Sequence, residues 1–333
     1  MVPNMVPNMA RRLAVTVATF AIAGSAFART GALKLIPNDA VSVGVIRVAD
    51  MRNSPLSSTL FQQTDRISSH GDGQMFLEDA GLQPAKDVDL VVVATSPAQN
   101  LGTEAEVLVA VDGRFNVDRL SAALVKRGAV ARNGYFVLPE KEASQGKRGV
   151  VAFPDGSLAL IGSESAVAQA LESRATGGTT FLTASGLGRE VARIDKHATA
   201  WAVVDVPRAA RLAHVPQVGS HSQQGQALQS AMKSVSTLVM WATDAGDSLK
   251  FGGIGVAHDE ETLQLLEDTI RGGLAAMRLA SQDNSPELVS VLRKFEVSHT
   301  ADTVQVTGSI PADMLKSFIA KHHMEEKHHM ETK

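Results

Sequence analysis

The same order of strand-like and helix-like segments occurs twice along this chain, and this repetition restricts the folds open to it. Residues 88–95 (VDLVVVAT) and 235–243 (VSTLVMWAT) are apolar runs that end on the same Ala-Thr pair, and each predicts a central strand. An alternating, β-rich segment precedes each run, at residues 40–48 and 200–206. Several elements that recur in one order predict an internal duplication.

Each predicted central strand is followed by a partner strand and then by a helix with matching apolar spacing. The helix positions that correspond between the halves are Val117, Leu120, Leu124 and Leu263, Leu266, Ile270. We therefore expect an α+β fold of two duplicated units in β-α-β-β-α-β order, the ferredoxin-like or split βαβ arrangement with antiparallel sheets. The pattern leaves open whether the two units share one sheet.

This organisation divides the chain into five parts. The predicted parts are a signal peptide (1–28), a first α+β repeat (33–175), a linker with a short helix (176–198), a second α+β repeat (199–320) and a C-terminal tail (321–333).

The N-terminus predicts export. Two arginines precede an apolar run at residues 13–23, and a small-x-small triplet ends at Ala28. This order is typical of a secretory signal peptide, so we expect cleavage after Ala28. The run is shorter than the ~20 residues that cross a bilayer, so we expect no transmembrane segment in the mature chain. The tandem repeat MVPNMVPN leaves two candidate start residues, Met1 and Met9.

Composition limits the location and the partners of the protein. The chain has 32 Lys plus Arg against 35 Asp plus Glu, a balance that speaks against a nucleic-acid partner. It has no cysteine, which excludes disulfides, thiolate metal sites and thiol nucleophiles. An exported protein without disulfides fits the periplasm better than the extracellular medium. We therefore expect a periplasmic or secreted protein of the bacterial cell envelope.

The most site-like stretch is the tail, KHHMEEKHHMETK, in which one hexapeptide is written almost twice. Its candidate ligands for Cu, Ni or Zn are His322, His323, Met324, Glu326, His328 and His329. On a continuous helix, His322, Glu326 and His329 share one face, and imidazole with carboxylate suits Zn, Ni or Cu(II). The metal-free MVPNMVPN is a similar terminal duplication. We therefore prefer a copying origin for the tail, with weak metal binding as the alternative.

Two loop histidines form a second candidate metal site. His70 and His221 occupy matching positions of the two repeats, where they would meet at a domain interface. Exposed loop histidines without a ligand are the simpler interpretation. Ser230 and Lys233 fit the S-x-x-K motif, but the S-D-N and K-T-G partners of that motif are missing, so we interpret them as a solvated helix face.

Three other motifs predict structure rather than chemistry. Asp259 precedes the second repeat's helix and predicts an N-cap. Asp112 precedes the corresponding helix of the first repeat and predicts a related role in a turn. Gly252, Gly253 and Gly255 lie within a strand pattern, which favours a bulge or a close backbone approach over a phosphate-binding loop.

The sequence favours binding over catalysis. It contains no G-x-S-x-G, H-E-x-x-H or P-loop motif, and no G-x-G-x-x-G follows a predicted strand. The leading hypothesis is a non-enzymatic module that binds a protein or an envelope component through its sheet or an interdomain groove. The alternatives are a periplasmic metal-handling protein that uses the tail and a hydrolase whose site the motifs do not reveal. No cofactor is expected apart from weakly bound metal.

Overall fold

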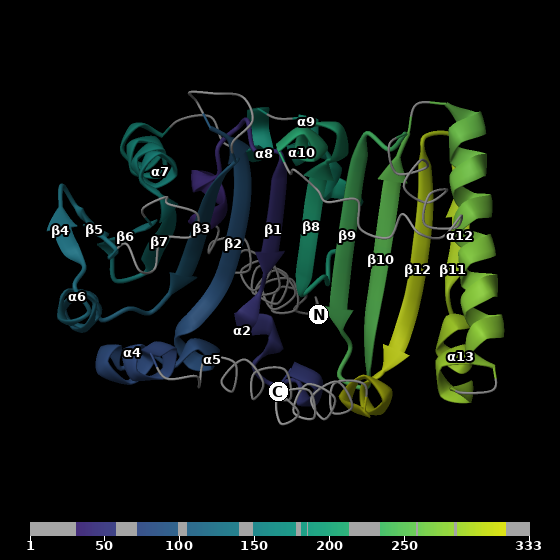
Figure 1. The fold of residues 1–333 in the computed structure, drawn as a ribbon, viewed down its shortest axis with the longest axis horizontal. Coiled ribbons are helices and arrows are strands. Elements are labelled where there is room, and N and C mark those ends of the chain that lie inside the picture. The colour runs from purple at the N-terminus through teal and green to yellow at the C-terminus, as the bar shows by residue number, and fades with distance from the viewer. Residues whose placement is uncertain are drawn as a thin grey trace, which may run out of the picture.

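One antiparallel sheet of twelve strands runs through the described part of the chain (Figure 1). The computed structural model describes residues 31–57, 72–98, 105–139, 149–177, 181–184, 186–212, 234–257, 259–282 and 285–317. The strands lie in the order β11-β12-β10-β9-β8-β1-β2-β3-β7-β6-β5-β4. Each neighbouring pair is antiparallel.

The strands and helices alternate along the chain in a mixed α+β pattern. The strands are β1 (Ser42–Ile46), β2 (Val88–Pro97), β3 (Ala105–Gly113), β4 (Val130–Arg132), β5 (Tyr135–Val137), β6 (Gly149–Asp155), β7 (Leu158–Ser163), β8 (Ala200–Asp205), β9 (Thr237–Asp244), β10 (Ser248–Val256), β11 (Glu296–His299) and β12 (Thr303–Pro311). The helices are η1 (Ala32–Leu35), α2 (Val48–Met51), α4 (Asp72–Ala80), α5 (Pro84–Asp87), α6 (Val117–Lys126), α7 (Glu164–Thr176), α8 (Phe181–Ala184), α9 (Gly186–Glu190), η4 (Val191–Arg193), α10 (Val206–Leu212), α12 (Glu260–Ser281) and α13 (Pro286–Leu292).

This topology shows that the ferredoxin-like prediction is wrong. In a split βαβ unit another strand lies between the two strands that the helix joins. Here β1 pairs directly with β2, from Ser42 opposite Thr95 to Ile46 opposite Val91. β1 also pairs with β8, so both predicted repeats contribute to a single sheet. The β-α-β-β-α-β order fits both topologies, because periodicity identifies a strand without identifying its neighbours.

The strand order is alike on the two sides of the central β1–β8 pair. It runs β1-β2-β3-β7-β6 on one side and β8-β9-β10-β12-β11 on the other, and β5 and β4 extend the first side alone. The predicted linker, residues 176–198, contains α8, α9 and η4. The sheet therefore divides into a first side, β1 to β7, and a second side, β8 to β12.

One face of the sheet is closed by the chain's own helices, and we call it the covered face. Strand register places Val45, Val92, Ala110 and Leu160 in one row, and each is at most 3% exposed. η1, α7, α8 and α9 close this face, and Phe181 of α8 is fully buried in its core. Such burial of branched aliphatic side chains is the main source of stability in a fold of this kind.

Among the described residues, helices cover the opposite face mainly near its two ends, and α2 covers part of β2 between them. Helices α4 and α6 pack over β5 and β6 through Phe136, Val151 and Phe153. At the other end α12 and α13 pack over β11 and β12 through Val297 and Val304. Figure 1 shows these two groups of helices at opposite ends of the sheet. The middle strands, between the two groups, form what we call the open face.

The predicted Asp259 cap is confirmed, and two glycines have clear structural roles. The Asp259 carboxylate caps α12, because its Oδ1 accepts a hydrogen bond from the Thr262 N–H at 2.7 Å. At Gly252 the close neighbour is a side chain and not the predicted backbone, because a Cβ there would lie 2.1 Å from the Trp241 ring. Helix α7 ends at Gly177, whose φ of 69° is the left-handed conformation that glycine adopts without strain. None of the described helices is both long and apolar enough to span a membrane.

Candidate functional site

A continuous row of apolar residues crosses the open face. Strand register joins Ile161 to Val109, then Val93, Gly44, Ala202 and Met240, on six adjacent strands from β7 to β9. At the usual spacing of about 4.8 Å between strands, this row is about 24 Å wide. The row contains no charged side chain and no hydrogen-bonding side chain.

Large side chains on this face remain partly exposed to solvent. Ile46, Val93, Val107, Ile161 and Met240 are each between 39% and 44% exposed, and all five point to the open face. An antiparallel sheet with one solvated face normally carries polar residues there. Contiguous exposed apolar surface is typical of an interaction site.

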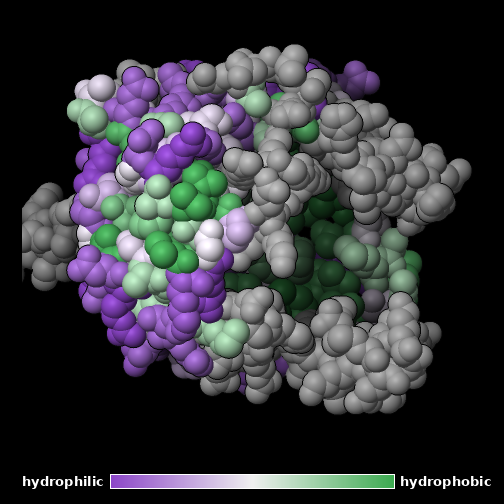
Figure 2. Space-filling model, turned by 60° about the vertical axis from the view of Figure 1, so that its left-hand side comes forward, coloured by the Kyte–Doolittle hydropathy of each residue, from purple (hydrophilic) through white to green (hydrophobic). Residues whose placement is uncertain are grey.

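The size of the side chains along the row produces a depression. Gly44 and Ala202 lie at its centre, whereas Val93, Ile161 and Met240 lie toward its sides. Glycine and alanine lower the surface because they leave the backbone nearly bare. Figure 2 shows hydrophobic residues visible together on the right of that view. The open face thus offers an apolar trough between two groups of helices.

A second candidate site lies on the covered face, between η1, α7 and the turn from β6 to β7. It is a cavity of about 340 Å³, with Leu35 and Leu158 among its apolar walls. Two carboxylates, Asp112 and Asp155, line it together with the Arg174 side chain. Paired carboxylates in a cavity are a common arrangement for acid-base work or for binding a cation.

The two carboxylates ionise very differently. Burial raises the pKa of Asp112 to about 6, and the Asp89 and Asp155 charges add to that effect, against the hydrogen bond from the Ala32 N–H. Hydrogen bonds from the Ser157 hydroxyl and N–H, both 2.6 Å long, lower the pKa of Asp155 to about 2. The ion pair with Arg174 lowers the pKa of Asp155 further. Asp155 is therefore a fixed negative charge, while Asp112 titrates close to neutrality.

Asp112 does not have the turn role that the sequence predicted. It lies on β3 and faces inward, where its Oδ1 and Oδ2 accept the Ala32 N–H at 3.1 and 3.2 Å. The cap of α6 is Asn116, which accepts a hydrogen bond from the Arg119 N–H at 3.1 Å. The signal in the sequence was alternation, because Leu108, Ala110 and Asp112 fall on the same face of one strand.

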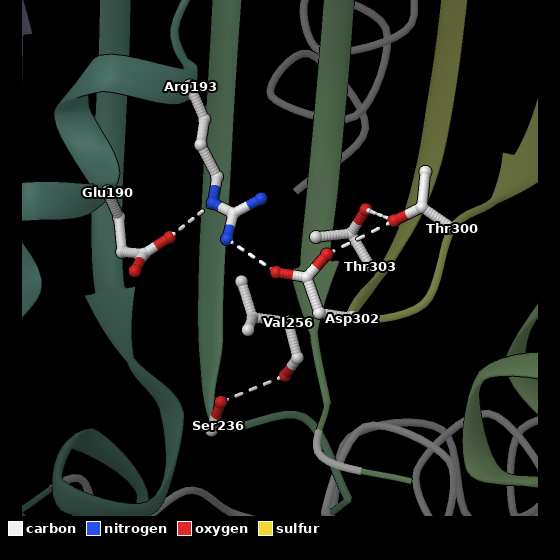
Figure 3. Close-up of polar contacts among 7 residues, drawn as sticks. All are labelled: Glu190, Arg193, Ser236, Val256, Thr300, Asp302 and Thr303. Atoms are coloured by element: carbon white, nitrogen blue, oxygen red, sulfur yellow. Dashed lines mark hydrogen bonds and ion pairs between the residues drawn. The ribbon is translucent and has the colours of Figure 1, made fainter. Parts of the chain in front are cut away.

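A polar network closes one end of the second side of the sheet (Figure 3). The Arg193 guanidinium donates to Glu190 at 2.6 Å and to Asp302 at 2.7 Å, which joins η4 to the turn between β11 and β12. Thr300 donates to Asp302 at 3.2 Å and lies 2.7 Å from the Thr303 hydroxyl. The hydrogen bond to Asp302 raises the pKa of Arg193, so the guanidinium stays charged. The side chains of this network hydrogen-bond to one another, so we interpret the network as structural.

The metal sites predicted from the sequence lie outside the described residues. This holds for His70 and His221, and for the tail ligands His322, His323, Met324, Glu326, His328 and His329. It holds also for Ser230, Lys233 and the signal peptide, residues 1–28. Metal binding by these groups stays a prediction. Within the described ranges, no cluster of three or more His, Asp or Glu side chains is arranged to hold a metal ion.

Comparisons with known proteins give a distant structural likeness. No family model matches the sequence, and no curated protein matches it. Crystal form I of TP0453 is 10% identical, with a TM-score of 0.44, and the match covers 87% of this chain and 96% of that chain. Crystal form IV of TP0453 is 11% identical, with a TM-score of 0.45, covering 86% and 95%. Likeness at this level does not bear on function.

Proposed function

We propose that this protein is a non-enzymatic binding module that holds an amphipathic helix of a partner protein in the trough of its open face. The observation that carries the proposal is the uninterrupted apolar row from Ile161 to Met240, in which Ile161, Val93 and Met240 are about two-fifths exposed. Covering a surface of this kind with a partner stabilises the complex by about 25 cal/mol per Å² of apolar area buried.

The geometry favours a helix over an added strand. The trough lies within the sheet, where β1, β2 and β8 already pair with neighbours on both sides. Recognition there must use side chains, because the backbone groups of these strands are occupied. A helix is about 10–12 Å across with its side chains, and the row of about 24 Å accommodates that width.

The partner's location follows from the N-terminal pattern. We propose that the chain is exported with cleavage after Ala28, so the partner is an envelope protein. This agrees with the lack of cysteine, because the fold then forms without a disulfide.

Site-directed photo-cross-linking in cells of the native source tests the proposal. A photo-reactive phenylalanine analogue replaces Met240, on the open face, or Val130, a control that is 64% exposed on edge strand β4. We expect one defined protein adduct from position 240 and none from position 130. Mass spectrometry should place the cross-linked peptide on the apolar side of an amphipathic helix.

A charge on the side of the trough provides the second arm of the test. Val93→Glu buries a carboxylate against the partner, and we expect it to reduce the adduct at position 240 at least about tenfold. Val130→Glu adds the same charge at the control position and should leave the adduct unchanged. A lipid adduct at position 240, or an adduct that is insensitive to Val93→Glu, would contradict the proposal.

A further inference from the structure

The cavity on the covered face carries charge of both signs. Lys34 and Arg174 lie at its rim, and Asp112 lies deeper, between β3 and η1. Two lysine or arginine side chains face two carboxylates, Asp112 and Asp155, so the lining is close to neutral at neutral pH. A neutral lining with separated charges suits a ligand that is itself neutral overall and carries both signs.

The two carboxylates are not equally free to bind a ligand. Both oxygens of Asp155 have protein partners, Ser157 and Arg174. Asp112 accepts only the Ala32 N–H among the described residues, at 3.1 and 3.2 Å to its two oxygens. An amide oxygen would accept that bond equally well, so the fold does not require a charge at this position. Asp112 therefore retains acceptor capacity toward the cavity.

The rim offers a cation of its own. Lys34 is exposed and lines the cavity, and no described carboxylate forms an ion pair with it. The Arg174 side chain is 39% exposed and uses one terminal nitrogen on Asp155, which leaves its other N–H groups toward solvent and the cavity. Lysine and arginine together are a usual site for a carboxylate.

We infer that this cavity binds a small zwitterion of the amino-acid class, with its ammonium on the Asp112 carboxylate and its carboxylate between Lys34 and Arg174. The volume of about 340 Å³ lies at the small end of the range for ligand pockets, roughly 300–1,000 Å³. The site lies on the opposite face of the sheet from the trough, so it does not depend on the partner proposed for the open face.

The titration of Asp112 supports an ammonium as the buried group. The pKa of Asp112 is raised to about 6, because burial and two nearby carboxylates disfavour its charge. A bound ammonium supplies the missing opposite charge and lowers that pKa. Binding must then release protons near about pH 6, and affinity must fall below that pH as Asp112 becomes protonated.

Calorimetric titration of the purified full chain at about pH 7.5 tests the inference, with each free L-amino acid in turn as the probe. We expect at least one to bind, and its N-acetylated form and its amide to bind at least about tenfold more weakly. The first derivative lacks the ammonium and the second lacks the carboxylate. A site for amines alone would accept the amide, and a site for anions alone would accept the acetylated form, so either result would overturn the inference.

Three variants locate the site. Asp112→Asn keeps an acceptor for Ala32 and should reduce affinity at least about tenfold, as should Lys34→Gln on the exposed rim. Asp39→Asn removes a carboxylate from an exposed turn outside the cavity and should leave affinity unchanged. Circular dichroism establishes that each variant is folded. Absence of binding by every amino acid up to about 10 mM, or full affinity in Asp112→Asn, would show the inference to be wrong.

Discussion

Strands β7 and β12 occupy corresponding places on the two sides of the sheet, and they are covered differently. β7 lies beside β3 and is closed on the covered face by α7, on which Val167 is fully buried. β12 lies beside β10, and the helices that pack against it, α12 and α13, lie over its other face. The two sides thus share a strand order but place their largest helices on opposite faces.

The side chains of the two strands record this difference. β7 is apolar on both faces, with Leu158 and Leu160 on one and Ala159 and Ile161 on the other. β12 alternates, because Val304 and Val306 face α12 while Thr303, Gln305, Thr307 and Ser309 face the opposite way. An antiparallel sheet needs apolar residues only where another layer covers it. Two sides of a sheet with the same strand order can therefore be covered by helices on different faces.

The polar network of Figure 3 lies on the second side of the sheet, where the described residues include no counterpart of α7. Arg193 reaches from η4 to Asp302 in the turn between β11 and β12. On the first side, helix α7 performs the corresponding closure through apolar burial. A partly exposed ion pair provides far less free energy than a packed helix, so the second side should be the less stable one at this end.

Substitutions at matched positions test this comparison with the largest expected effect. Leu160 is fully buried, and Leu160→Ala should lower the free energy of unfolding by ~2–5 kcal/mol through lost burial and the cavity that remains. Gln305 lies on β12 and points to the same covered face of the sheet as Leu160 does. Gln305→Ala should change the free energy of unfolding by less than about 0.5 kcal/mol. Urea unfolding monitored by circular dichroism measures both. Equal losses would mean that a layer covers β12 as fully as β7.

Asp112 on β3 offers a second comparison of the two sides, with a smaller expected effect on the free energy of unfolding. Val256 takes the corresponding place in β10 and is buried among apolar residues. The pKa of Asp112 is raised to about 6 from 3.8, so the folded chain binds its proton more tightly than the unfolded chain does. Stability from this group is therefore greatest below about pH 4 and is lost as pH rises through about 6.

Asp112→Asn should accordingly raise the free energy of unfolding by ~1–3 kcal/mol at about pH 7 and by nearly nothing at about pH 4. Asp155→Asn is the matched opposite, because its lowered pKa means that its charge stabilises the fold at neutral pH. Thermal unfolding across this pH range measures both variants. A stabilisation by Asp112→Asn that persists unchanged at about pH 4 would exclude titration as its cause.

The smallest expected effect comes from the ion pair itself. Arg193→Met keeps an unbranched apolar stem and removes the charge, and it should lower the free energy of unfolding by ~0–1 kcal/mol. The Arg193 and Asp302 side chains are 34% and 55% exposed, so the effect should shrink further in about 1 M NaCl, where screening is strong. A loss above about 2 kcal/mol in denaturant titrations would place the network among the main supports of the second side.

The sequence predicted the positions of strands and helix caps better than it predicted which strands pair. Periodicity located β2 and β9 within two residues, and turn chemistry located the Asp259 cap, because both are local properties. The direct pairing of β1 with β2 was missed, because it depends on contacts between distant segments. The alternation in β12 was visible, but its meaning required knowledge of which face α12 covers.

The candidate sites were less predictable than the fold. From the sequence we expected only that binding would use the sheet or an interdomain groove. The row from Ile161 to Met240 could not be predicted, because it depends on the register of six strands. Asp112 looked like a turn residue, since its inward orientation is visible only once β3 is extended through Gly113. The histidine-rich tail resembles a metal-binding motif, whereas an isolated aspartate such as Asp112 matches no motif.

The β1–β8 pair also sets the pace at which this chain can reach its native state. Val43 pairs with Val203, so about 160 residues must be synthesised before the central joint can close. Contacts so distant in sequence give a high contact order and slow folding. The chain loses the entropy of loop closure before these contacts form and stabilise it. Until β8 arrives, β1 presents an unpaired edge that another chain can extend by strand addition. The joint that unites the finished sheet is thus the point at which a nascent chain is most prone to aggregate.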